Sequence, residues 1–139
     1  MGLILYSHET KESGKRLLKI IKEAVPDHHL EIYSSIDELT ERLHQPLVDV
    51  GVAVLHAGTH GDLMDILYLG DYLGELRVVL VLPDSQPEAL KKAHILHPRF
   101  IASSRNDYKH LGSVLKKMMD LYDKRHCVGR NIQSKYKQS

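Results

Sequence analysis

The sequence predicts an α/β domain of three layers, α/β/α, in which a five-stranded parallel sheet of order 2-1-3-4-5 has helices on both faces. Two observations lead to this fold class. Five short apolar runs alternate strictly with five segments of helical period, which is typical of βα units and a parallel sheet. The first, third and fourth runs are apolar on both faces, as central strands should be, so the second and fifth belong at the edges.

The predicted strands are short runs rich in valine, isoleucine and leucine. They cover residues 3–6, 30–33, 50–55, 78–82 and 100–102. The second run alternates apolar with polar residues, for example Leu30, Glu31 and Ile32, which suits an edge strand. The fifth run is short and is followed by polar Ser103, so we place it at the other edge.

Each predicted helix has an apolar stripe at helical spacing. The stripes lie within residues 17–25, 36–43, 63–73, 90–96 and 111–122. Polar residues that precede the stripes are typical helix caps, because their side chains accept a hydrogen bond from an amide of the first turn. The predicted caps are Ser35 and Ser85, each in a capping box, with Thr59 and Asn106 or Asp107 for two further helices.

The composition is that of one compact globular domain: 139 residues, 42% apolar and 27% charged. The formal net charge of +1 gives no reason to expect a nucleic acid or an anionic membrane as partner. A single cysteine, Cys127, excludes an internal disulfide and a cysteine-rich zinc site. The amino terminus lacks a secretory-signal pattern and no apolar run is long enough to cross a bilayer, so we expect a cytoplasmic protein.

The charge is unevenly distributed. Residues 124–139 carry five basic and no acidic side chains, which leaves residues 1–123 with fourteen basic and eighteen acidic ones, a net charge of −4. We therefore divide the chain into a folded domain, 1–123, and a basic C-terminal tail, 124–139. The tail is interpreted as a solvated appendage or as a basic docking arm.

The pattern of residues 2–123 resembles the CheY-like receiver domain of bacterial response regulators, the phosphoacceptor modules of two-component signal transduction. The last third carries most of the resemblance. There an apolar run ending at Leu82-Pro83 is followed by a capped helix, by residues 98–103 and by a long amphipathic helix. The resemblance implies the flavodoxin-like fold and a pocket at the carboxyl ends of the strands.

The residues expected to carry receiver chemistry are different here. The resemblance implies an acidic pair for Mg²⁺ after the first strand, an aspartate ending the third, a hydroxyl after the fourth and a lysine after the fifth. The residues at the corresponding places are Ser7, His8 and Glu9 after the first strand, His56 at the end of the third, Pro83 and Asp84 after the fourth, and Ser103 and Ser104 after the fifth. Phosphoryl transfer needs a nucleophile, a metal and cationic groups around the moving charge, and most of these are missing.

We therefore expect a degenerate receiver, or pseudo-receiver, that is not an enzyme and holds no cofactor or metal. Such a module would act by phosphorylation-independent contacts with a protein partner. At this length we expect no output domain within the chain.

Two other functions remain open. His8, after Leu5, Tyr6 and Ser7, is similar to the start of the mannose-family IIA domains of the sugar phosphotransferase system, which implies a histidine phosphocarrier. Alternatively, a flavodoxin-like ligand or metal site could use neutral imidazoles with a carboxylate, as in Zn²⁺ sites. Its candidate residues are Ser7, His8, His56, His60 and Asp62, with the glycine-rich loop of residues 57–62 for a nucleotide or flavin.

The segment over residues 62–73 has more apolar side chains than one buried helix face needs. The additional ones are Met64, Tyr68, Leu69 and Tyr72. Tyrosine and methionine are favoured at protein interfaces. These residues are therefore a candidate surface for a protein partner or for a homodimer.

Overall fold

The computed structural model describes residues 2–7, 12–26, 28–47, 50–74, 76–82, 84–103 and 107–121. Its sheet has five parallel strands in the order β2-β1-β3-β4-β5, which confirms the predicted fold class. The strands are β1 (Gly2–Ser7), β2 (His29–Tyr33), β3 (Val50–His56), β4 (Arg77–Val81) and β5 (Phe100–Ala102). The predicted tail, 124–139, and Cys127 lie outside the described residues.

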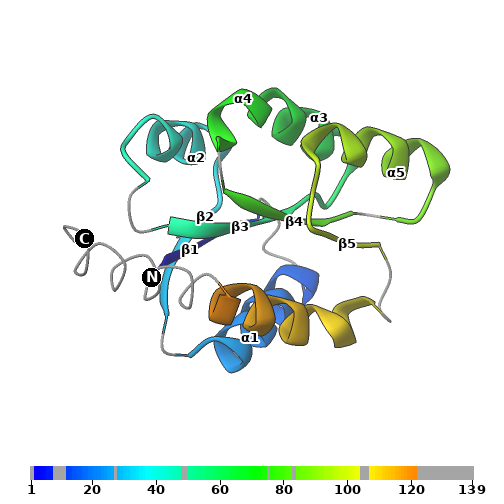
Figure 1. Ribbon diagram of the computed structural model, residues 1–139. Helices are drawn as coiled ribbons and strands as arrows, with labels where there is room; N and C mark the ends of the chain where they lie inside the picture. The colour runs from blue at the N-terminus through cyan, green and yellow to red at the C-terminus, as the bar shows by residue number, and fades with distance from the viewer. Residues whose placement is uncertain are drawn as a thin grey trace, which may run out of the picture.

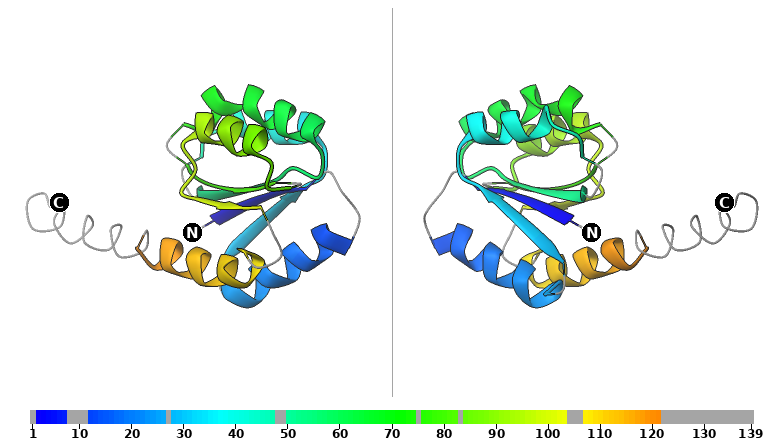
Figure 2. Two further views of the ribbon diagram at one scale, coloured as in Figure 1. Left: turned by 90° about the vertical axis from the view of Figure 1, so that its right-hand side faces the viewer. Right: turned by 90° about the vertical axis from the view of Figure 1, so that its left-hand side faces the viewer.

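The helices form two layers, one on each face of the sheet (Figure 1). One layer holds α2 (Ile36–Leu43), α3 (His60–Tyr68), α4 (Gly70–Leu73) and α5 (Pro87–Ala93), which continues into the short 3-10 helix η1 (His94–Leu96). The other holds α1 (Glu12–Ala24) and a helix that spans residues 107–121. The end-on views in Figure 2 show the sheet between the two layers.

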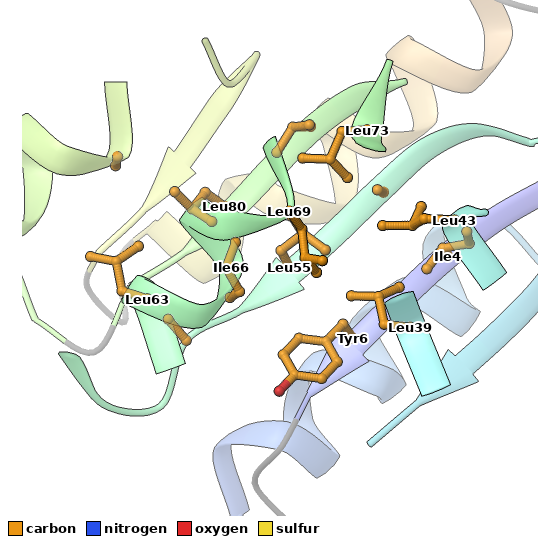
Figure 3. Close-up of a cluster of buried hydrophobic side chains, with 14 of the residues drawn as sticks. Ile4, Tyr6, Leu39, Leu43, Leu55, Leu63, Ile66, Leu69, Leu73 and Leu80 are labelled. Atoms are coloured by element: carbon orange, nitrogen blue, oxygen red, sulfur yellow. The ribbon is translucent and has the colours of Figure 1, made fainter. Parts of the chain in front are cut away.

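Each layer has its own hydrophobic core, because successive side chains of a strand point to opposite faces. Leu3 and Leu5 of β1 pack towards α1 and the 107–121 helix, whereas Ile4 and Tyr6 pack towards α2, α3 and α4. Figure 3 shows the second of these cores, with Tyr6 close to the carboxyl end of β1. The central strand β3 is buried along its whole length, as its apolar sequence predicts.

The long helix predicted over residues 63–73 is instead two helices. The chain leaves α3 at Leu69, and the four-residue α4 begins at Gly70. A side chain at Gly70 would be tight, since its Cβ would lie 3.1 Å from Leu96 Cδ2. The absence of a side chain on Gly70 therefore lets the start of α4 lie close to η1.

Two of the predicted caps are confirmed and one is wrong. Ser35 accepts a hydrogen bond from the amide of Asp37, one residue earlier than the capping box predicts, and Thr59 accepts one from Asp62. Ser85 does not cap α5, whose first flanking residue is Gln86. The reason is that the preceding Asp84 side chain binds the Gln86 amide and fixes the turn itself.

None of the helices in the described ranges is both long and apolar enough to cross a membrane.

Candidate functional site

The carboxyl ends of β1 and β3 bring Ser7 and His56 together. The two residues are paired in the register of the parallel ladder, and Ser7 Oγ lies 2.8 Å from His56 Nδ1. His56 is buried, with 3% of its surface exposed. Residues two positions earlier, Leu5 and Val54, pack towards α1 and the 107–121 helix, so the Ser7–His56 pair faces the same layer.

His60 and Asp84 form a second pair, between the start of α3 and the loop after β4. His60 Nε2 lies 3.1 Å from Asp84 Oδ2, and both side chains are well exposed. Asp84 Oδ1 also accepts the amide hydrogen of Gln86 at 3.1 Å. The hydrogen bond from the Gln86 amide, supported by the hydrogen bond with His60, lowers the pKa of the Asp84 carboxyl.

The amino terminus of α3 is closed by its own side chains. Thr59 Oγ1 accepts from the Asp62 amide at 3.1 Å, and Asp62 Oδ2 accepts from the Gly58 amide at 3.2 Å. Asp62 is only 7% exposed, so its carboxylate is part of the loop's structure. These amides would otherwise be the donors for a bound phosphate, and a carboxylate beside them repels an anion. The loop of residues 57–62 therefore lacks the features of a nucleotide site.

Tyr6 lies in the core between β1 and α2, near Leu39 (Figure 3). Burial, together with the nearby carboxylates of Asp62 and Asp65, raises the pKa of its phenol to about 12. Tyr6 is therefore a neutral, structural residue at physiological pH.

Ser103, which follows β5, is held by Asp107 at the start of the last helix. Asp107 Oδ2 accepts from the Ser103 amide at 2.8 Å and from its hydroxyl at 3.4 Å. This carboxylate connects the carboxyl end of the edge strand to the helix that follows it.

The predicted pocket is thus brought together only in part. Ser7 meets His56 as expected, but His60 turns to Asp84 and Ser103 to Asp107. The predicted pocket residues His8, Glu9, Pro83 and Ser104 lie outside the described residues.

Among the candidate metal ligands that the structure describes, His56 and His60 have separate partners. His56 is buried beside Ser7, whereas His60 is exposed beside Asp84. Over the described ranges, no group of three His, Cys, Asp or Glu side chains could hold a metal ion.

Three residues of the predicted contact surface are exposed, as such a surface requires, and one is buried. Tyr68 is 78% exposed, Tyr72 45% and Met64 40%. Leu69 is only 4% exposed and packs into the core with Ile66 and Leu73 (Figure 3). Tyr72 also packs against His44 at the end of α2, with ring centroids 4.5 Å apart. We call Met64, Tyr68 and Tyr72 the α3–α4 surface.

Sequence reasoning missed the roles of Asp62 and Asp107. Both patterns are visible in the sequence, since Asp62 is three residues after the cap Thr59 and Asp107 is four after Ser103. A polar residue one helical turn beyond a strand end can bind the free amides there. The pairing of His60 with Asp84 has no comparable sequence signal, because it joins the start of α3 to the distant loop after β4.

Comparisons with known proteins identify the fold. The sequence matches no protein-family model and no curated protein sequence. Among solved structures, a response regulator receiver protein from Pseudoalteromonas atlantica is similar, with a TM-score of 0.68 and 10% identity over 86% of this chain and 98% of that one. The Salmonella typhimurium response regulator RcsB aligns with a TM-score of 0.64 and 15% identity, over 86% of this chain and 60% of that one.

A third similar structure is a Burkholderia pseudomallei protein described as related to pilus assembly. It has a TM-score of 0.60 and 17% identity over 85% of this chain and 88% of that one. This chain therefore has the fold of a receiver domain. At such identities, the likeness extends to the fold and not to the chemistry of the site.

Proposed function

We propose that this protein is a degenerate receiver-like signalling module, which acts through phosphorylation-independent protein–protein contacts and is not an enzyme. The observation that carries the proposal is the hydrogen bond between Ser7 and His56. A serine and a histidine lie where the carboxyl ends of two adjacent central strands meet. A phosphate-accepting receiver has carboxylates at these two strand ends.

The chemistry of this pair supports the proposal. Mg²⁺ is bound by hard oxygen ligands, mostly carboxylates and phosphates, and a hydroxyl–imidazole pair supplies no negative charge. In addition, His56 is 3% exposed and its Nδ1 is engaged by Ser7, so an external phosphoryl donor has little access to it.

Acetyl phosphate with Mg²⁺ tests the proposal directly. We expect the intact mass of the full-length protein to stay unchanged after incubation. A phosphorylated product that is labile in alkali would overturn the proposal, because it would reveal an acyl phosphate. A product stable in alkali and labile in acid would favour the phosphocarrier instead, with the His8→Ala variant deciding whether His8 carries the group.

The α3–α4 surface supports the second half of the proposal, contact with a protein. Its three side chains are exposed on one helix layer, whereas the Ser7–His56 pair faces the other. Tyrosine and methionine are favoured at protein interfaces. Whether a second copy of the chain is the partner is decided by comparing the oligomeric state of the wild type with that of Tyr68→Lys.

A further inference from the structure

A groove runs between α1 and the helix of residues 107–121, on the opposite side of the sheet from the α3–α4 surface. Figure 2 shows these two helices forming the outer layer on that face. The groove encloses about 930 Å³ and is lined by five residues from each helix. We call it the basic groove. Its residues are Arg16, Lys19, Ile20, Glu23 and Ala24 from α1, and Tyr108, Lys109, Gly112, Ser113 and Lys116 from the last helix.

The walls of the groove carry a concentrated positive charge. Four of the lining residues are basic and one is acidic. Within the part of the chain that the structure describes, none of the four basic side chains forms an ion pair; the pairs found there are Arg42 with Glu31 and His60 with Asp84. The cluster is also local, because the folded domain as a whole has more acidic than basic residues.

The floor of the groove is apolar. It is made by Ile20 and Ala24 of α1 with Gly112 and Tyr108 of the last helix. The helices approach closely at Gly112, where an added Cβ would lie 3.5 Å from both Ile20 and Ala24. Arg16 is close enough to Tyr108 to oppose the rise in the phenol pKa that burial causes. The basic wall therefore lies near the apolar floor.

We propose that the basic groove binds an acidic amphipathic helix of a partner protein. The apolar stripe of that helix would lie on the floor formed by Ile20, Ala24 and Gly112, while its carboxylates face the cations on both walls. A helix in a groove of this kind is recognised by apolar anchors at helical spacing. Charge complementarity adds to its on-rate and its specificity.

The apolar floor favours an acidic helix over a nucleic acid. A nucleic acid is bound mainly through its phosphates and would gain nothing from an apolar floor. An amphipathic helix has an apolar stripe to cover that floor as well as carboxylates for the basic residues.

This inference shares one premise with the proposed function, namely that the protein acts by binding other proteins. The basic groove and the α3–α4 surface lie in different helix layers. Each can therefore fail as a binding surface without the other.

The test uses a synthetic peptide as probe, about four helical turns long. Leucine occupies the positions on the helix face that would lie on the floor of the groove, and glutamate occupies the others. Binding to the full-length protein is measured by fluorescence anisotropy. We expect the double variant Lys19→Glu/Lys116→Glu to weaken binding because it places like charges opposite the peptide carboxylates. The expected loss is at least about tenfold in affinity, or about 1.4 kcal/mol. The same variant should gain affinity for the matching lysine peptide.

The matched control is Lys91→Glu/Lys92→Glu, which makes the same change in charge at two exposed positions of α5 in the other layer. We expect it, and Tyr68→Lys, to retain wild-type affinity for the glutamate peptide. Circular dichroism and thermal melts verify that every variant is folded.

Several results would overturn the proposal. One is an absence of binding to the glutamate peptide by the wild type. Another is an equal loss of binding in the α5 control, which would mean attraction by net charge alone. A third is groove-dependent binding of a DNA duplex or of phosphatidylserine vesicles in preference to the peptide, which would assign the groove to those ligands.

Discussion

The Ser7 hydroxyl lies 2.8 Å from Nδ1 of His56, across the ladder between two adjacent parallel strands. This hydrogen bond joins the last residues of β1 and β3, which are neighbours in the sheet. His56 is buried beside the hydrophobic core under α1. The bond therefore gives one nitrogen of the imidazole ring a hydrogen-bond partner within an apolar environment.

Replacing Ser7 by alanine should therefore destabilise the protein. We expect the free energy of unfolding in urea to fall by about 1–2 kcal/mol, because the buried ring of His56 loses a hydrogen-bond partner. The control is Ser85→Ala, an exposed serine that does not cap its helix, for which we expect a change within about 0.5 kcal/mol. Equal effects of the two substitutions would show that the Ser7–His56 bond contributes little.

Ionisation of the Tyr6 phenol should lower the free energy of unfolding in alkali. Its pKa is raised from 10.0 to about 12, so the folded state holds its proton more tightly than the unfolded state. The resulting stabilisation is complete below pH 10 and is lost as the pH rises towards 12. Two pKa units correspond to about 2–3 kcal/mol.

The measurement is chemical denaturation of the wild type and of Tyr6→Phe at neutral pH and near pH 11. The variant should lose less stability in alkali than the wild type does. Tyr108→Phe is the comparison, because it retains the Tyr6 contribution while removing a partly buried phenol whose pKa is also raised. If Tyr6→Phe and the wild type lost the same amount, Tyr6 would not be the group responsible.

The edge strand β2 should depend on Glu31. Its carboxylate accepts hydrogen bonds from Arg42 Nε at 2.7 Å and Nη2 at 3.2 Å, and from the Tyr33 hydroxyl at 2.6 Å. These bonds, chiefly those from Arg42, lower the pKa of Glu31 below 4.5. Because the charged form is favoured in the fold, the stabilisation is present above that pH and is lost as the pH falls through the lowered pKa.

We therefore expect Glu31→Gln to lower the free energy of unfolding at neutral pH by about 1–2 kcal/mol. The gap to the wild type should narrow in acid. Glu41→Gln, at an exposed position of α2, provides the comparison and should be nearly neutral. A gap for Glu31→Gln that did not change with pH would mean that packing, and not charge, is lost.

Most of the fold could be predicted from the sequence because its strands and helices differ in period. Apolar residues on both faces mark β1, β3 and β4 as central, which leaves β2 and β5 for the edges, as observed. The break between α3 and α4 could not be predicted, since the apolar stripe continues through it. Gly70, the first residue of α4, also lies close to Leu96, a tertiary contact that the helical period does not reveal.

The candidate site was predictable only where the sheet defines it. Ser7 and His56 meet because both end neighbouring strands, a consequence of strand order. Asp84 was expected in the pocket, but its bonds to His60 and Gln86 depend on how two loops fold. Loop conformation is set by such local hydrogen bonds, which have no period in the sequence.

Leu69 and Tyr68 are neighbours in the sequence with opposite environments. Leu69 is 4% exposed and Tyr68 is 78% exposed. The spacing of Ile66, Leu69 and Leu73, three and then four residues, is that of one buried helix face, so the burial of Leu69 could have been inferred from the sequence.

This contrast predicts different results for the two residues. Leu69→Ala should lower the free energy of unfolding by about 2–5 kcal/mol, because it leaves a cavity in the core under α3 and α4. Tyr68→Lys should change stability by no more than about 0.5 kcal/mol and should act only on association. Thermal denaturation and sedimentation velocity, measured on both variants, separate the two effects. If Tyr68→Lys destabilised the protein as much as Leu69→Ala does, Tyr68 would belong to the core, and the α3–α4 surface would lose its most exposed member.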